Sequence, residues 1–400
     1  MVKQTHILVM HPNLYKCLNI KYIDYILLQK RRIFMAFIHQ KNLYYKITQV
    51  GKNSLAWDVQ SESLNNDAAI LLYRDGYGKD NQEFVFFQLD DYLYAIVNKH
   101  SGKVVQPYSN GRFYQYTWNG NDAQKFYIRN DPRGEAIYEI VNQAYGKVAS
   151  YGATGRIGYD DRVEFVDLDD SNPSQTDRMY FINEAKDDVL GPPNQFRVPS
   201  LPPTSTRPSV PNYTTGSPYE QMPFKSEVRI VGTALIPCIM VKDSSLSDYT
   251  KIHQSPFYRL EKTEHWEQTY SYVLAPNEKR TYSYKTGMSQ VDQQKLTDTL
   301  QITVGADFGL KFGQQTAGLK IGISKTLQSE ISSTFTQLTE QTEGSEIVNS
   351  FNDQILGRTQ YQLVTTYNLY RTDGSVVSNP IIVKNDKVAV TQSAMTKAFS

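Results

Sequence analysis

The sequence predicts an all-β protein of two domains, a barrel of three repeated units followed by an elongated β-sheet. Its 400 residues include 29 tyrosines and 17 phenylalanines, and aromatic residues favour strands over helices. An internal repeat occurs three times in the first half of the chain. Long segments of alternating apolar and polar residues fill the second half, which is the pattern of two-faced strands.

Residues 1–35 stand apart as a leader or propeptide-like extension. They are rich in lysine and arginine, and the segment IDYILLQKRRIFM has the composition of a short amphipathic helix. They contain no uninterrupted apolar core followed by a small-residue cleavage site, so we expect no secretory signal. Met35 would make a suitable functional start, and a membrane role for the extension is the weaker alternative.

The threefold repeat occupies residues 36–188. The units run from ITQVGKNSLAWDV to DNQEFVF, from IVNKHSGKVVQPY to DAQKFYI, and from IVNQAYGKVASYG to TDRMYFI. Gly, Asn and Asp turns divide each unit into several short strands. Three units of four strands can close into one barrel, which leaves no exposed sheet edge.

Each repeat ends in a similar motif, Gln-x-aromatic or a weaker form of it, at Gln82, Gln124 and Arg178. This motif resembles the ricin-type β-trefoil lectin repeat, in which Gln-x-Trp marks the core of each unit. The resemblance implies a β-trefoil whose sugar sites combine an early acid, an aromatic platform and a later Asn-Gln pair. The glutamines and the closing aromatic residues are expected in the core whether or not a sugar binds.

The first repeat matches that site pattern in order and spacing, with Asp58, Tyr73, Asn81 and Gln82. A carboxylate and an amide can hydrogen-bond vicinal sugar hydroxyls, while the tyrosine ring stacks on the C–H side of the sugar. Ordinary turn hydrogen bonds between Asp58 and Asn81 are an equally weighted alternative.

The other two repeats depart from the pattern. The third has Ser150 at the acid position and Asp177 later. The second has an amide at the acid position, and Tyr116 competes with a tryptophan for the platform. A possible second sugar site therefore consists of Gln106, Trp118, Asp122 and Gln124.

Residues 189–225 are predicted to be a linker between the two domains. Nine of the 17 prolines lie between Pro192 and Pro223. Such a segment is extended and semi-rigid, and it has no core of its own.

Residues 226–400 return to strands, several of them longer than usual, and we expect them to form an elongated sheet. No run of 18 apolar residues occurs, so no transmembrane helix is expected. Within this domain, TLQITVGADFGLKFGQQTAGLKIGISKTL has the alternation of a two-faced hairpin. One strand would run from Leu300 to Phe312 and the other would follow GQQTAG.

This hairpin is long enough to cross a bilayer when tilted. Asp307 and Lys311 would then face the lumen of a pore, and Lys325 is the one charged residue on the lipid side. An amphipathic pair lying on a core is the alternative. The predicted lipid-facing residues are Leu300, Ile302, Val304, Phe308, Leu310, Phe312, Leu319, Ile321 and Ile323.

Enzymatic and metal-dependent functions find little support. The six histidines are scattered, and no HExxH, GxSxG, Walker A or GxGxxG motif occurs. Cys17 and Cys238 lie far apart in the sequence and allow at most one disulfide. Cys238 follows Pro237 in an apolar strand, so we expect a buried, inert thiol there. The 42 basic and 41 acidic residues nearly balance, which argues against a nucleic-acid partner. We therefore expect no enzyme, no cofactor and no metal.

Three blocks of the second half resemble a known family. GTALIPCIMVKD, PFYRLEKTEHWEQ and PNEKRTYSYKTGMSQVDQQKL are similar to the core blocks of the Toxin_10 family, the Bin-like or Tpp insecticidal crystal proteins of spore-forming bacilli. The resemblance covers roughly residues 40–400, without the leader. It implies an N-terminal β-trefoil followed by an aerolysin-like pore-forming domain at residues 226–400.

The resemblance also implies a protoxin stored in a parasporal crystal of the sporulating cell. It would dissolve in an alkaline larval gut, be trimmed by proteases, bind a glycan or receptor on the gut epithelium and oligomerise into a pore. A second toxin protein is a possible partner. The tyrosine excess suits alkaline dissolution, because phenols lose their protons near pH ~10. A carbohydrate-binding agglutinin without pore formation is the main alternative, and a polysaccharide-active enzyme with a lectin module ranks behind it.

Overall fold

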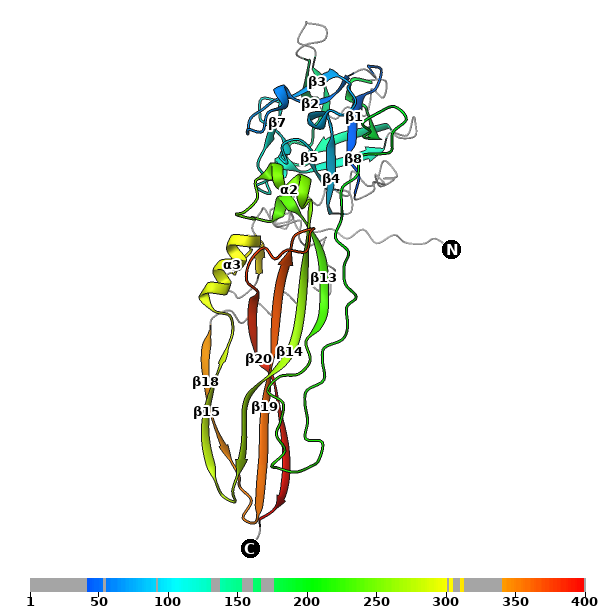
Figure 1. The fold of residues 1–400 in the computed structure, drawn as a ribbon. Helices are drawn as coiled ribbons and strands as arrows, with labels where there is room; N and C mark the ends of the chain where they lie inside the picture. Colours follow the sequence, from blue (N-terminus) through cyan, green and yellow to red (C-terminus); the bar gives the residue numbers. More distant parts are fainter. Residues whose placement is uncertain are drawn as a thin grey trace, which may run out of the picture.

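The computed structural model describes residues 42–52, 55–90, 93–130, 137–152, 161–166, 176–300, 302–304, 310–312 and 340–398. A head of short strands stands on one end of a long antiparallel sheet (Figure 1). The all-β class is confirmed, as is the order of a trefoil followed by an elongated sheet. The predicted extension at residues 1–35 lies outside the described residues.

In the described part of the head there are twelve strands, four from each repeat. Six of them close a barrel by pairing in the order β1-β4-β5-β8-β9-β12 and back to β1. The remaining six form the hairpins β2–β3, β6–β7 and β10–β11. A closed six-stranded barrel with three hairpins is a β-trefoil. The strands are β1 Tyr45–Gln49, β2 Leu55–Val59, β3 Ile70–Arg74, β4 Phe84–Asp90, β5 Leu93–Asn98, β6 Val104–Pro107, β7 Phe113–Tyr116, β8 Phe126–Asn130, β9 Ile137–Asn142, β10 Val148–Gly152, β11 Asp161–Val166 and β12 Tyr180–Glu184.

The trefoil core contains the closing aromatic residue of each repeat. Phe84, Phe126 and Tyr180 are all fully buried, as the repeat motif predicts. Trp57 lies among them, with its ring 6.2 Å from that of Phe84 and 5.5 Å from that of Tyr180. A fully buried aromatic side chain contributes roughly 1.5–3 kcal/mol. The repeat therefore places its largest residues where the three units meet.

The second domain is a four-stranded antiparallel sheet in the order β13-β14-β19-β20. Its long strands span 17 or 18 residues, which is about 55–60 Å at 3.3 Å per residue. A separate ribbon, β15–β18, lies beside this sheet (Figure 1). The strands are β13 Arg229–Pro237, β14 Phe257–Leu274, β15 Lys279–Thr286, β18 Gln341–Val348, β19 Gln354–Tyr370 and β20 Ile381–Lys397.

Among the described residues of this domain, two α-helices interrupt the strands, where the sequence predicts only strands. The helix α2 spans Asp248–Gln254, and the side chain of Ser247 caps it by accepting from the Thr250 amide. The helix α3 spans Gln290–Leu300 and begins after Ser289, whose hydroxyl accepts from the Asp292 amide. At α3, the serine followed three residues later by an acid is a helix-start signal that the strand interpretation overlooked. Neither helix of the described residues is long and apolar enough to cross a bilayer.

The predicted strand from Leu300 to Phe312 is not a single strand in this structure, and that prediction is wrong here. Leu300 ends α3, and β16 (Ile302–Val304) pairs antiparallel with β17 (Leu310–Phe312). Residues 305–309 and 313–339 lie outside the described residues, and with them Phe308, Leu319, Ile321 and Ile323 of the predicted hairpin.

The proline-rich segment 189–225 runs extended along the long sheet (Figure 1). Its residue Met222 packs in a cluster with Trp266 of β14 and Tyr361 of β19. The carbonyls of Pro208 and Pro223 accept hydrogen bonds from the Trp266 indole at 2.8 Å and the Tyr361 hydroxyl at 2.6 Å. The segment is thus extended, and it forms a strap that covers part of the sheet.

Candidate functional site

The predicted site residues of the first repeat line one pocket. Asp58 lies on β2, and Tyr73 lies on β3 of the same hairpin. Because Asp58 pairs with Leu71, and Tyr73 follows two residues later, both side chains lie on one face of the hairpin. Asn81 and Gln82 come from the 3-10 turn Asp80–Gln82. The pocket measures about 480 Å³ and is lined by Asp58, Gln60, Ser61, Glu62, Leu71, Tyr73, Arg74, Asp75, Gly76, Lys79, Asn81 and Gln82.

Gln82 organises the floor of this pocket. Its Nε2 donates to Asp58 Oδ2 at 2.8 Å and to the Arg74 carbonyl at 3.0 Å, while its Oε1 accepts from the Gly76 amide at 2.9 Å. Asn81 donates to the Val59 carbonyl at 3.2 Å. The buried Gln82 is therefore a core residue that also orients the carboxylate of Asp58.

Asp58 is a buried acid. Burial raises its pKa to about 6, although hydrogen bonds from Gln82 and Asn81 act in the opposite direction. The carboxylate is therefore an acceptor held at a cost to stability, which is typical of residues placed for binding. Tyr73 is 38% exposed, so its ring is open to a ligand.

Several pocket residues were not predicted from the sequence. Glu62, Arg74, Asp75 and Lys79 add two acids and two bases to the rim. Ser61 and Glu62 have φ values of 56° and 52°, in the left-handed region that non-glycine residues rarely adopt. Such backbone strain often accompanies a binding site. The sequence gives little warning of it, because the 3-10 turn Gln60–Glu62 contains neither glycine nor asparagine.

The second repeat reproduces the hydrogen bonds of the first with an amide in place of the acid. Gln124 Nε2 donates to Gln106 Oε1 at 2.9 Å and to the Thr117 carbonyl at 3.0 Å, while its Oε1 accepts from the Asn119 amide at 2.7 Å. Asp122 forms an ion pair with Lys125 at 3.1 Å. These residues are thus brought together, without the acid that distinguishes the first site.

Trp118 is wrongly predicted as the platform of a second sugar site. It is only 6% exposed and packs in the hydrophobic cluster shared by the two domains. Tyr116, the alternative, occupies the position on β7 that corresponds to Tyr73 on β3. In the third repeat, the Ser150 hydroxyl donates to the Asp177 carbonyl at 3.3 Å.

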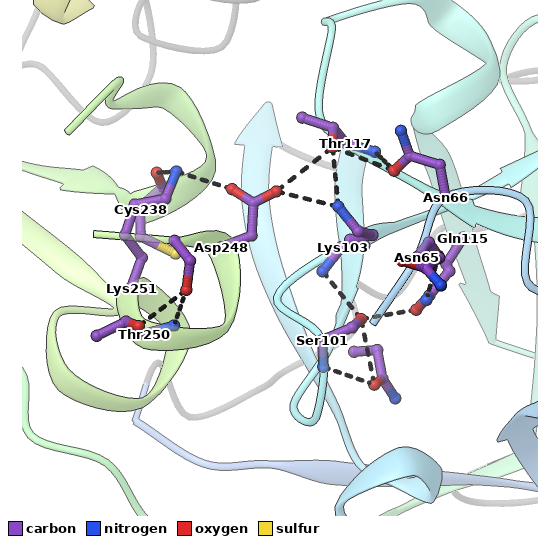
Figure 2. A network of polar contacts seen from close by, with 12 residues as sticks. Asn65, Asn66, Ser101, Lys103, Gln115, Thr117, Cys238, Asp248, Thr250 and Lys251 are labelled. Atoms are coloured by element: carbon purple, nitrogen blue, oxygen red, sulfur yellow. Dashed lines mark hydrogen bonds and ion pairs between the residues drawn. The ribbon is translucent and has the colours of Figure 1, made fainter. Parts of the chain in front are cut away.

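The second repeat contacts α2 of the elongated domain through a polar network (Figure 2). Asp248 accepts from Lys103 at 3.3 Å and from the Thr117 hydroxyl at 3.4 Å, and it forms an ion pair with Lys251 at 3.0 Å. Gly102 lies directly against the backbone of Asp248, where an added Cβ would come within 2.1 Å of its carbonyl oxygen. The helix α2 therefore packs against the loop that would border a second sugar site.

Cys238 of this interface is a free, buried thiol, and burial raises its pKa to about 12. Cys17 lies outside the described residues. Among the residues that the structure describes, no group of three His, Cys, Asp or Glu side chains is arranged to hold a metal ion.

Comparison with known proteins identifies relatives that are similar to this chain in sequence. The family described as ricin-type beta-trefoil lectin domain-like matches residues 32–112 and 80–156. The binary larvicide subunit BinA of Lysinibacillus sphaericus is 29% identical over 314 residues, which cover 77% of this chain and 79% of the relative. The subunit BinB of the same organism is 29% identical over 366 residues, or 87% of this chain and 77% of the relative.

The insecticidal crystal protein Cry35Ab1 of Bacillus thuringiensis is 25% identical over 327 residues, which cover 79% of this chain and 80% of the relative. The crystal structure of Cry35Ab1 aligns with a TM-score of 0.69 and 22% identity, covering 89% of this chain and 90% of that one. This likeness establishes a shared fold over both domains.

Proposed function

Because this chain is a Bin- and Cry35-like insecticidal toxin of the Toxin_10 family with a ricin-type β-trefoil lectin domain, we propose that it acts as a pore-forming protoxin. The trefoil binds a glycan or glycoconjugate receptor of the gut epithelium through Asp58, Tyr73, Asn81 and Gln82. An aerolysin-like elongated domain then inserts a β-hairpin into the membrane. The chain works without catalysis and without a cofactor.

The observation that carries the binding step is the first-repeat pocket. It combines a buried carboxylate oriented by Gln82 with an exposed tyrosine ring on one face of one hairpin. Sugars present hydroxyl groups on their edges and C–H groups on one face, so they match this pair of groups. The residues Gln106, Asp122 and Gln124 lack such an acid and are the weaker candidate.

The proposed life cycle follows from the relatives. Cry35Ab1 is named as an insecticidal crystal protein, and BinA and BinB are named as subunits of a binary larvicide. We propose that this chain is stored in a parasporal crystal, dissolves and is proteolysed in an alkaline gut, and forms homo-oligomers at the target membrane. A second toxin subunit is a candidate partner.

The decisive experiment treats the protein with trypsin at alkaline pH and measures conductance in planar lipid bilayers. Sequencing the new termini identifies the cleavage points. Stepwise conductance that requires proteolysis is the expected result. A treated protein that agglutinates glycan-bearing liposomes but neither conducts nor releases their dye would contradict pore formation and support the agglutinin alternative.

A further inference from the structure

The helix α2 also contacts the first repeat, at the turn that carries two of the predicted sugar-binding residues. This pocket turn is the 3-10 turn Asp80–Gln82, and its last two residues, Asn81 and Gln82, line the first-repeat pocket. Its first residue, Asp80, lies opposite His253 of α2, with 3.8 Å between Oδ2 and Nε2. One short turn therefore belongs both to the pocket and to the joint between the two domains.

We infer that His253 is a positioning residue of the glycan pocket, which acts from the elongated domain by holding Asp80. The inference rests on the proposed function, since it concerns the same pocket. It adds a residue of the second domain to a site whose lining residues all belong to the first repeat. Glycan binding and the docking of α2 are then coupled, so each favours the other.

The carboxylate of Asp80 lies between two cations, one from each domain. From the trefoil, the ammonium group of Lys99 lies 2.8 Å from Asp80 Oδ1 and 2.8 Å from Glu83 Oε2. From α2, the imidazole of His253 faces the other oxygen, Oδ2. His253 and Lys99 together hold the pKa of Asp80 at about 2, although burial acts in the opposite direction. Asp80 therefore stays ionised, and it is held from both sides while His253 is protonated.

The surroundings of His253 favour its protonated form. Its Nδ1 lies 2.8 Å from the Tyr249 carbonyl oxygen, and its Nε2 faces Asp80. Both neighbours are acceptors, so only the imidazolium, which has two N–H groups, presents a proton to each of them. A neutral ring would turn a lone pair towards one acceptor. The contact with Asp80 accordingly raises the pKa of His253 above its ordinary value of 6.5, although burial lowers it.

The other titratable groups around His253 come from its own helix and from the trefoil. Lys99 faces it beside Asp80 and opposes its protonation. The ring of Tyr249, one turn earlier on α2, lies 4.4 Å from the imidazole. The ring of His100 lies 6.1 Å from that of Tyr249 on the trefoil side. Among the described residues, Asp80 is therefore the acid that pairs with His253.

This contact makes the pocket sensitive to alkaline pH. The stabilising effect of His253 is complete below its unfolded pKa of 6.5 and is lost as the pH rises through the higher folded value. Glycan affinity should therefore fall at alkaline pH. Protonation of Asp58, whose pKa is about 6, lowers the affinity on the acid side. Binding is then strongest between these limits, away from the alkaline medium that is proposed to dissolve the crystal.

Two substitutions of His253 in the full chain separate its charge from its packing. H253Q is neutral at every pH, and H253K keeps a positive charge up to about pH 10. Wild-type affinity for the neutral glycans of a microarray should fall about two- to fivefold from about pH 7 to pH 9, the effect of a partly exposed ion pair. H253K should retain its affinity at the higher pH. H253Q should bind equally at both, at the lower level.

The matched control is another histidine of the same joint. His100 lies on the turn that follows β5, where its ring contacts that of Tyr249. H100Q should keep the alkaline loss of affinity. D80N should abolish this loss, because it removes the carboxylate that His253 faces. The double variant D80N/H253Q should bind like either single variant, since both substitutions remove the same contact.

Hydrogen exchange tests the positioning without any glycan. The amides of Gln82 and Glu83 close the pocket turn by donating to the carbonyls of Lys79 and Asp80 at 2.8 and 3.2 Å. Corrected for intrinsic rates, they should exchange faster in H253Q than in wild type, and H253K should restore their protection. The inference is wrong if H253Q keeps the wild-type alkaline loss of affinity or the wild-type protection of this turn. A wild-type chain that binds no glycan overturns the proposed glycan binding instead, while exchange still tests the role of His253.

Discussion

At the scale of single residues, Asp58 is the clearest sign of function. A carboxylate that served only the fold would be expected to gain from its hydrogen bonds, and its pKa would fall. Here burial outweighs the bonds from Gln82 and Asn81, and the pKa rises to about 6. The charged form of Asp58 therefore lowers the stability of the fold. The corresponding position of the second repeat holds Gln106, which is a neutral amide.

We predict that D58N makes the protein more stable and abolishes glycan binding. The pKa of Asp58 in the folded state lies above its unfolded value of 3.8. The free energy of unfolding therefore falls as the pH rises from the unfolded pKa through the folded value of about 6. Removing the charge should raise the free energy of unfolding at pH 7 by roughly 1–3 kcal/mol. Urea unfolding and a glycan microarray measure the two effects.

The matched control is S150A, in the corresponding position of the third repeat. It should lower stability slightly and leave glycan binding unchanged. Wild-type binding should also weaken as the pH falls through about 6, when Asp58 gains its proton. A D58N variant that is less stable and still binds glycans would show that Asp58 serves only the turn.

At the scale of elements, the strands β4 and β5 serve two cores at once. Phe84 and Phe86 of β4 face the trefoil core, while Val85 and Phe87 face the cluster shared with the elongated domain. The ring of Phe87 lies 5.2 Å from that of Phe257 on β14. A strand buried on both faces is apolar at consecutive positions. The run FVFF of β4 therefore indicates a strand that packs against the second domain as well as in the core of the repeat.

The second repeat provides a test of this docking through equivalent glycines. Gly102 and Gly146 occupy the same turn of repeats two and three, with φ values of 69° and 64°. An added Cβ at Gly102 would collide with Asp248, and at Gly146 it would meet nothing within 4 Å. Both alanine variants suffer the same backbone strain. G102A should lose a further 1–3 kcal/mol or so from the collision.

Differential scanning calorimetry and hydrogen exchange at α2 measure this difference. G102A should expose the amides of α2 to exchange, and G146A should not. Equal losses of stability and unchanged exchange at α2 in both variants would contradict the docking of the second repeat on this helix.

At the scale of the whole molecule, the head and the sheet form one body joined by a continuous apolar cluster. Tyr44 of the trefoil reaches across this joint, and its hydroxyl donates to the Ile252 carbonyl at 3.1 Å. Burial raises the pKa of Tyr44, and likewise of Tyr180 and Tyr258, well above the ordinary value of 10. These tyrosines resist alkali while the fold is intact. Any alkaline dissolution driven by phenols therefore depends on tyrosines other than these three.

The buried tyrosines predict a steep loss of stability above pH 10. Their stabilising effect is complete below the unfolded pKa of 10 and is lost as the pH rises from there towards the folded value. Each fully buried tyrosine should lower the free energy of unfolding by about 1.4 kcal/mol per pH unit in that range. Urea unfolding between pH 9 and 12 measures the slope.

The variant Y44F is the control, because it removes one phenol and keeps the ring. Its slope above pH 10 should be shallower by one tyrosine's share, although it also loses one hydrogen bond at all pH values. Identical slopes for Y44F and wild type would contradict the role of Tyr44. Separately, crystal dissolution without a rise between about pH 9 and 11 would contradict the proposed use of exposed phenols.

Local patterns in the sequence were sufficient for the class, the repeat and the grouping of the first-repeat residues around one pocket. Alternation with period two reports the faces of a strand, and a repeated turn reports a repeated unit, so both are legible without any distant contact. Asp58, Tyr73 and Gln82 lie on neighbouring elements of one repeat, so their spacing along the chain already implied their proximity.

Only the tertiary structure could decide which faces are covered. In the sequence, Trp118 and Tyr116 are equally good candidates for the aromatic platform. The packing of α2 on the second repeat buries Trp118, so its ring cannot stack on a sugar. The segment from Leu300 to Phe312 alternates like one strand, yet it is folded back as β16 and β17 behind α3. Alternation describes what a segment can form, whereas the contacts of the whole molecule select which form has the lower free energy.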